Sequence, residues 1–94
     1  MAGRPLVGHD FAEQRRDVAA HRIVTGEGRQ YEGTWEDIVR GMRAASSAAS
    51  RSLEEFMRTE ARRGESITGM KISTRDAETF IRASADAGLL RILR

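Results

Sequence analysis

The chain has 94 residues, of which 39% are hydrophobic and 32% are charged, and its formal net charge is +2. It contains no cysteine, which excludes disulfides, thiolate metal sites and cysteine nucleophiles. No apolar run approaches the roughly 18 residues that a membrane span needs, and the first eight residues lack the apolar stretch of a signal peptide. We therefore expect a small cytoplasmic protein with one modest core.

The N-terminal third of the chain predicts an arm followed by a β-hairpin. Residues 1–19 show weak periodicity and contain the only proline, so we expect a partly flexible arm ahead of a single domain over residues 20–94. Residues 20–24 are predicted to form a strand and residues 29–32 its partner. The sequence between them, Thr-Gly-Glu-Gly, is a glycine-bearing turn of hairpin length.

Three helix starts are predicted from hydroxyl residues that stand three positions ahead of an acid. The pairs are Thr34 with Asp37, Ser52 with Glu55, and Ser73 with Asp76. This spacing is typical of a capping box, in which the hydroxyl accepts a backbone N–H bond and the acid reaches back to the cap residue. We expect helices to begin after residues 34 and 52, and a last helix to be capped by Ser73 or its neighbour Thr74.

Apolar residues follow the first two caps with helical spacing. The first group is Trp35, Ile38, Val39 and Met42, and the second is Leu53, Phe56 and Met57. The second group lies 18 residues after the first, which is five helical turns, so one unbroken helix over residues 35–63 would keep the stripe in phase. Average helix length favours two helices with a break in the serine- and alanine-rich stretch 44–51. We predict the break and leave the single helix open.

The C-terminal third predicts a strand, a helix and a strand. We expect Gly64 to end the second helix, residues 67–72 to form a strand, and Gly88 to end the last helix in a left-handed conformation before a strand over 89–93. Strand, helix and strand in sequence imply a parallel βαβ unit. The predicted fold class is α+β, with a small sheet of the N-terminal β-hairpin plus these two later strands, packed with two or three amphipathic helices.

No catalytic, cofactor-binding or metal-binding motif is found, so we expect a protein that is not an enzyme. Gly26 and Gly28 are not part of a dinucleotide fingerprint, because Tyr31 stands where the third glycine is required. The two histidines, His9 and His21, lack the spacing of a zinc site. No serine lies in the glycine-flanked nucleophile elbow of a hydrolase.

The basic residues are fifteen arginines and one lysine, and the sequence pI is about 9.9. Arginine binds phosphate bidentately, so this composition raises a nucleic-acid hypothesis. However, bases and acids alternate along the chain without a basic block, and a GC-rich bacterial-type genome would produce the same arginine bias. A nucleic-acid footprint requires the arginines to converge in space.

We favour a small non-catalytic protein-protein interaction module, such as an adaptor, an assembly factor or a regulatory subunit. We expect it to self-associate as a dimer or larger assembly, because the helical stripe exceeds what a narrow sheet can cover. The interaction candidates are Phe56, Met57, Leu53, Leu90 and Ile92. The alternative is a small nucleic-acid-binding regulator that uses the arginine-bearing hairpin and helix faces, with candidates Arg22, Arg29 and Tyr31. A membrane partner is not expected.

Overall fold

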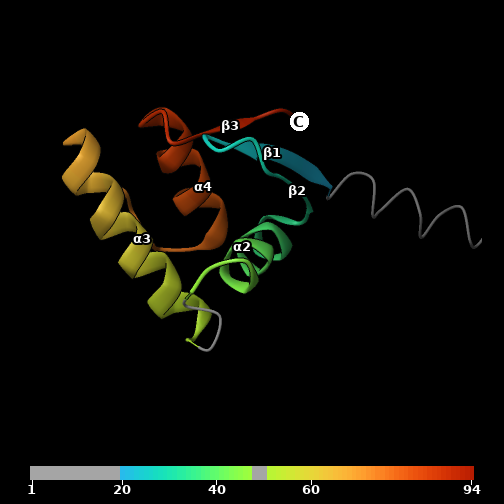
Figure 1. Ribbon diagram of the computed structural model, residues 1–94, viewed down its shortest axis with the longest axis horizontal. Helices are drawn as coiled ribbons and strands as arrows, with labels where there is room; N and C mark the ends of the chain where they lie inside the picture. The colour runs from blue at the N-terminus through green and yellow to red at the C-terminus, as the bar shows by residue number, and fades with distance from the viewer. Residues whose placement is uncertain (1–19, 48–50) are drawn as a thin grey trace, which may run out of the picture.

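The computed structural model describes residues 20–47 and 51–94 (Figure 1). The predicted arm over residues 1–19 lies outside these ranges. The described elements confirm the α+β class, with three strands and three helices. In chain order they are β1 (His21–Thr25), β2 (Gln30–Gly33), α2 (Trp35–Ala44), α3 (Leu53–Thr68), α4 (Ala77–Asp86) and β3 (Leu90–Ile92).

The strands form one antiparallel sheet in the order β2-β1-β3. β1 and β2 make the predicted hairpin, in which Ile23 is paired with Tyr31. On its other side β1 pairs with β3, and Ile23 is paired with Ile92. The three described helices lie on one side of the sheet, and no helix within residues 20–47 and 51–94 covers the other face, which we call the helix-free face (Figure 1).

The first two predicted helix starts are confirmed as capping boxes. Asp37 N donates to Thr34 Oγ1 at 3.0 Å, and Thr34 N donates back to Asp37 Oδ2 at 3.1 Å. The start of α3 has the same reciprocal bonds between Ser52 and Glu55. Each pair satisfies two backbone groups that the first helical turn would leave without partners.

The third predicted start is wrong, because Asp76 and not Ser73 or Thr74 is the N-cap of α4. The backbone N–H of Thr79 donates to Asp76 Oδ1 at 2.7 Å. Ser73 Oγ instead accepts from Arg75 N at 3.3 Å, which closes a local turn ahead of the helix. The two candidates compete for the same short segment, and the carboxylate is the stronger acceptor.

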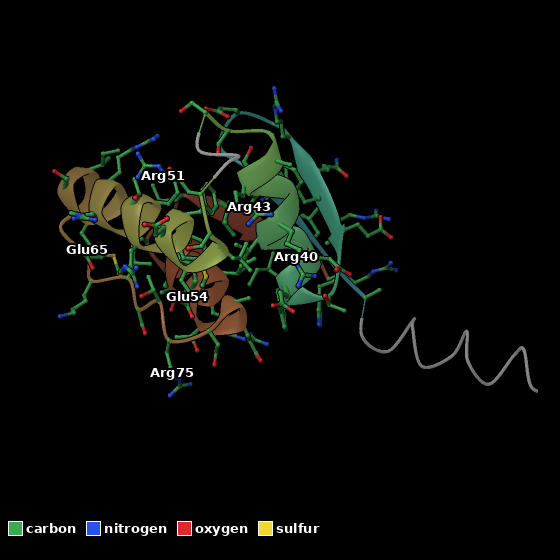
Figure 2. All side chains as sticks on the ribbon, turned by 90° about the horizontal axis from the view of Figure 1, so that it is seen from below. Arg40, Arg43, Arg51, Glu54, Glu65 and Arg75 are labelled. Atoms are coloured by element: carbon green, nitrogen blue, oxygen red, sulfur yellow. The ribbon has the colours of Figure 1, made fainter. Side chains whose placement is uncertain are left out.

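The predicted break between two helices is confirmed, since α2 ends at Ala44 and α3 begins at Leu53. Arg43 Nη1 donates to the carbonyl oxygen of Arg51 at 3.2 Å across this connection (both residues are labelled in Figure 2). The break lets the two apolar stripes face one core. Val39 of α2 is 0% exposed and Phe56 of α3 is 2% exposed.

The predicted end of the second helix at Gly64 is wrong. The helix continues through Gly64 to Thr68 and ends at Gly69, whose φ of 76° is the left-handed cap conformation. Gly64 serves packing instead: a Cβ at this position would lie 2.7 Å from the Cδ1 atoms of both Ile72 and Leu89. The missing side chain therefore lets Ile72 and Leu89 pack against the C-terminal half of α3.

The predicted strand over residues 67–72 is also wrong, and with it the parallel βαβ unit. Ile67 and Thr68 form the end of α3, and the residues from Met70 to Thr74 pair with no strand of the described sheet. This segment is held by the α3 side chain Glu65 (labelled in Figure 2), whose Oε2 accepts from Ile72 N at 2.8 Å. The Glu65 carboxylate thus accepts the backbone N–H bond that a neighbouring strand would otherwise accept. Ile72 still lies in the core and is 3% exposed.

The last helix ends as predicted in a left-handed glycine, since Gly88 has a φ of 82°. Gly88 N donates to Ala85 O, and Leu89 N donates to Ser84 O at 2.9 Å, which together form a Schellman motif. This motif turns the chain directly into β3. The core beneath the sheet then gathers residues from the three described helices, from β1 and β3, and from the segment between α3 and α4: Ile23, Ile38, Val39, Phe56, Met57, Ala61, Ile72, Phe80, Ile81 and Leu90.

Candidate functional site

Three of the predicted interaction residues lie in the core of a single chain. Phe56, Met57 and Leu90 are 2%, 5% and 8% exposed. The other two, Leu53 and Ile92, are partly buried and pack against that core. These five side chains are therefore used mainly inside one chain, although Phe56 and Leu90 also line a groove at the surface.

An open groove lies between the second half of α3 and the β1–β2 turn, with a volume of about 480 Å³. Its walls include three apolar side chains of the core or its edge, Phe56, Phe80 and Leu90. Ile67 lies at its α3 side and is 69% exposed, the highest value among the large hydrophobic side chains of the described residues. We call this feature the α3 groove.

The rim of the α3 groove is charged and close to neutral overall. Glu60 and Arg63 of α3 lie on one side, and Arg63 Nη2 is 3.2 Å from Glu60 Oε2. Glu27 and Arg29 of the hairpin turn lie on the other side. An apolar floor inside a polar rim is the usual anatomy of a protein-protein contact.

The sequence did not indicate Ile67 as an exposed residue, because residues 67–72 were predicted to be a strand. The signal that could have found it is the helical spacing of Phe56, Glu60, Gly64 and Ile67, which continues along one face of α3. Its two companions among the exposed large hydrophobic residues are Met70 and Leu93, each 45% exposed.

The nucleic-acid candidates are separated by the sheet. Arg22 lies on the helix-free face, where its Nη2 is 3.3 Å from Glu32 Oε1. Tyr31 is paired with the fully buried Ile23 and so lies on the helix-covered face, where its ring closely approaches Gly41. Arg29 lies beside the turn and its N–H donates to Thr25 Oγ1. The stacking platform that would combine Tyr31 with Arg22 is therefore not formed.

The helix-free face instead brings together arginines that are far apart in the sequence. β1 places Arg22 and Val24 on this face, opposite in direction to Ile23. Arg91 of β3 is paired with Val24 and so shares the face. Arg94 reaches the same place, with its Nη2 4.0 Å from Glu32 Oε2. Arg91 and Arg94 were not among the predicted site residues, because β3 was expected beside a parallel strand rather than beside β1.

A second open groove is formed where the three helices begin, with a volume of about 950 Å³. Its lining includes the three N-cap residues Thr34, Ser52 and Asp76. Each cap already accepts a backbone N–H of its own helix, at 3.0, 3.1 and 2.7 Å. The first-turn donors that could hold an anion are thus partly used by the caps.

Trp35 is the best-defined aromatic contact of the described residues. The ring of His21 stacks on it with centroids 3.7 Å apart and an interplanar angle of 12°. The guanidinium carbon of Arg82 lies 5.2 Å from the Trp35 ring, and Arg82 Nε also bonds to Glu78 Oε2 at 2.8 Å. These contacts join β1, α2 and α4, so we assign His21 and Trp35 a structural role.

Within residues 20–47 and 51–94, no group of three or more His, Cys, Asp or Glu side chains is arranged to hold a metal ion. Across the same residues, none of the helices has the length and apolar character needed to cross a membrane. Comparisons with protein-family models, with curated proteins and with solved structures found no match to this chain.

Proposed function

We propose that this protein is a non-catalytic, cytoplasmic protein-protein interaction module that self-associates through the α3 groove. The observation that carries the proposal is the 69% exposure of Ile67 beside a groove with an apolar floor. Covering an exposed isoleucine completely is worth roughly 1.5–3 kcal/mol. An apolar side chain beside an apolar hollow therefore favours a protein contact over a catalytic or small-ligand role.

A second copy of the chain is the partner that this surface fits. A two-fold interface uses the same patch on both subunits, so one patch must supply both a projecting group and a hollow. The α3 groove supplies both, because Ile67 projects from α3 and the groove runs beside Phe56 of the same helix. If two α3 helices cross antiparallel near residues 61 and 62, Ile67 of each copy lies level with Phe56 of the other.

The rim charges support the same arrangement. In that antiparallel crossing, Glu60 of one copy lies level with Arg63 of the other, so the contacts across the two-fold axis are between opposite charges. Both side chains already lie 3.2 Å apart within one chain, and in the dimer they would form a four-charge network. Exposed pairs contribute little individually, so the apolar contact supplies the affinity and the rim supplies the register.

The test is the mass of the folded protein in solution, with Ile67→Lys as the variant. Sedimentation or light scattering at micromolar concentration should return twice the 10.5 kDa of one chain for the parent protein. Ile67→Lys should return a single chain, because a charge would have to enter the groove. Lysine is chosen because a cation is tolerated near the C-terminal end of a helix.

The matched control is Leu93→Lys, which makes the same change at a 45% exposed apolar residue outside the groove. It should keep the mass of the parent, and circular dichroism should show that both variants are folded. A parent protein that stays monomeric up to high concentration overturns the proposal. If Ile67→Lys and Leu93→Lys both gave the mass of a single chain, the dimer contact would not be specific to the α3 groove and the proposal would be overturned.

A further inference from the structure

The helix-free face of the sheet is a compact two-row surface, which we call the basic face. β-strand pairing places Glu32, Arg22 and Leu93 in one row, since Arg22 is paired with Glu32 and Leu93 N donates to Arg22 O at 2.7 Å. The second row is Gln30, Val24 and Arg91. Arg94 extends over the first row toward Glu32.

The basic face carries more basic than acidic side chains. Of the described residues, three arginines on this face, Arg22, Arg91 and Arg94, are opposed by one acid, Glu32, which leaves two positive charges. The formal net charge of the full chain is also +2, so acids and bases balance elsewhere. Diagonal neighbours on a sheet are about 7–8 Å apart, so Arg22 and Arg91 can reach neighbouring phosphates of one backbone.

Glu32 stands at a position that suits a phosphate oxygen. Guanidinium groups from β1 and from the residues after β3 approach its carboxylate, Arg22 at 3.3 Å and Arg94 at 4.0 Å. Both distances exceed the roughly 2.7–2.9 Å of a strong charge-assisted bond. The side chains of Arg22, Glu32 and Arg94 are 41%, 54% and 61% exposed, and such exposed pairs are weak. A polyanion can therefore replace the carboxylate.

We propose that the basic face binds the phosphate backbone of double-stranded DNA without reading its sequence. Charge complementarity carries the proposal, because duplex DNA presents about one negative charge per 1.7 Å of its axis. Duplex rather than single-stranded nucleic acid fits this face, since single strands are held largely by stacking of bases on aromatic rings. The ring side chains of the described strands, His21 and Tyr31, lie on the other face.

The proposal uses residues that do not line the α3 groove, so either can fail without the other. Fluorescence anisotropy with a labelled duplex of about 20 base pairs should give a dissociation constant of about 10⁻⁴–10⁻⁶ M at physiological salt. The binding should become tighter as the salt concentration is lowered. Arg22→Ala should reduce the slope of log K against log salt by about one. Glu32→Gln should increase the affinity about two- to fivefold for each arginine that it releases.

The matched control for Glu32→Gln is Glu78→Gln. Glu78 is 50% exposed and pairs with Arg82 on α4, so this variant changes the net charge equally at a different place. It should bind as the parent does or only slightly more tightly. Equal gains for both variants would mean that overall charge alone attracts DNA, which overturns the proposal. So would the absence of duplex binding at low salt, or tighter binding of a single strand of the same length.

Discussion

Among single residues, Gly64 has the clearest effect on the fold. It lies inside α3, where glycine is about 0.5–1 kcal/mol less favourable than alanine. In return the absence of a side chain lets Ile72 and Leu89 pack against the helix. Ile72 is 3% exposed and so has little room to move away. The position therefore balances helix propensity against packing.

Gly64→Ala should lower the free energy of unfolding by about 1 kcal/mol, since overpacking a core costs about 1–3 kcal/mol and exceeds the gain in helix propensity. Denaturant unfolding measures this change. The second variant is Ile72→Val, which deletes one of the two Cδ1 atoms that the new Cβ would meet. In that background Gly64→Ala should cost less, so the double-mutant cycle should show coupling. Additive effects, or a stabilised single variant, would contradict the packing explanation.

At the scale of elements, the start of α4 depends on one carboxylate. The backbone N–H of Thr79 donates to Asp76 and lowers the pKa of this carboxyl below its ordinary value, with smaller contributions from the Thr79 side chain and from Arg75. A lowered pKa in the folded state means that the contribution to stability is present above the unfolded pKa. That contribution is lost as the pH falls through the folded pKa.

Asp76→Ala should therefore destabilise the protein at neutral pH, and its difference from the parent should shrink as the pH falls below the ordinary pKa of an aspartate and through the lowered pKa of Asp76. Asp76→Asn should keep most of the stability at neutral pH, because asparagine is an equally good cap, but without this pH dependence. Unfolding curves at several pH values measure both effects. Ser73→Ala is the control and should cost less than Asp76→Ala at neutral pH. If Ser73→Ala destabilised the protein more than Asp76→Ala, Ser73 rather than Asp76 would be the N-cap of α4.

At the scale of the whole molecule, the two proposed surfaces lie on opposite sides of the sheet. Tyr31 and Leu90 of the α3 groove belong to the helix-covered side, whereas Arg22 and Arg91 belong to the helix-free side. A dimer formed through the α3 groove would leave both basic faces uncovered. Two such faces can contact one long duplex at the same time.

Dimerisation should therefore strengthen binding to long DNA more than binding to short DNA. Ile67→Lys should weaken the affinity for a duplex long enough to reach both basic faces, because the monomer loses the second contact. It should leave the affinity for a duplex that covers only one face nearly unchanged. Anisotropy titrations with two duplex lengths at one salt concentration make the comparison. If Ile67→Lys weakened the binding of both duplexes equally, the α3 groove and the basic face would not be independent surfaces.

The sequence alone determined the elements whose signals are local. The capping boxes at Thr34 and Ser52 needed only bonds between residues three apart, and the left-handed Gly88 needed only its own backbone freedom. The hairpin also follows from a short segment, whereas the break between α2 and α3 was favoured by average helix length and a single helix stayed open. For the same reason the α+β class could be predicted before any contact was known.

Only the tertiary structure decided what depends on contacts between distant segments. Gly64 resembles a helix end in the sequence, but Ile72 and Leu89 give it a packing role. Ile67 is exposed because α3 continues past that glycine. Arg22 and Arg94 are 72 residues apart in the chain, and they meet at Glu32 only because β3 pairs with β1. The basic face and the α3 groove could not be derived from sequence patterns, because strand order and helix packing are set by the free energy of the whole core rather than by any local stretch.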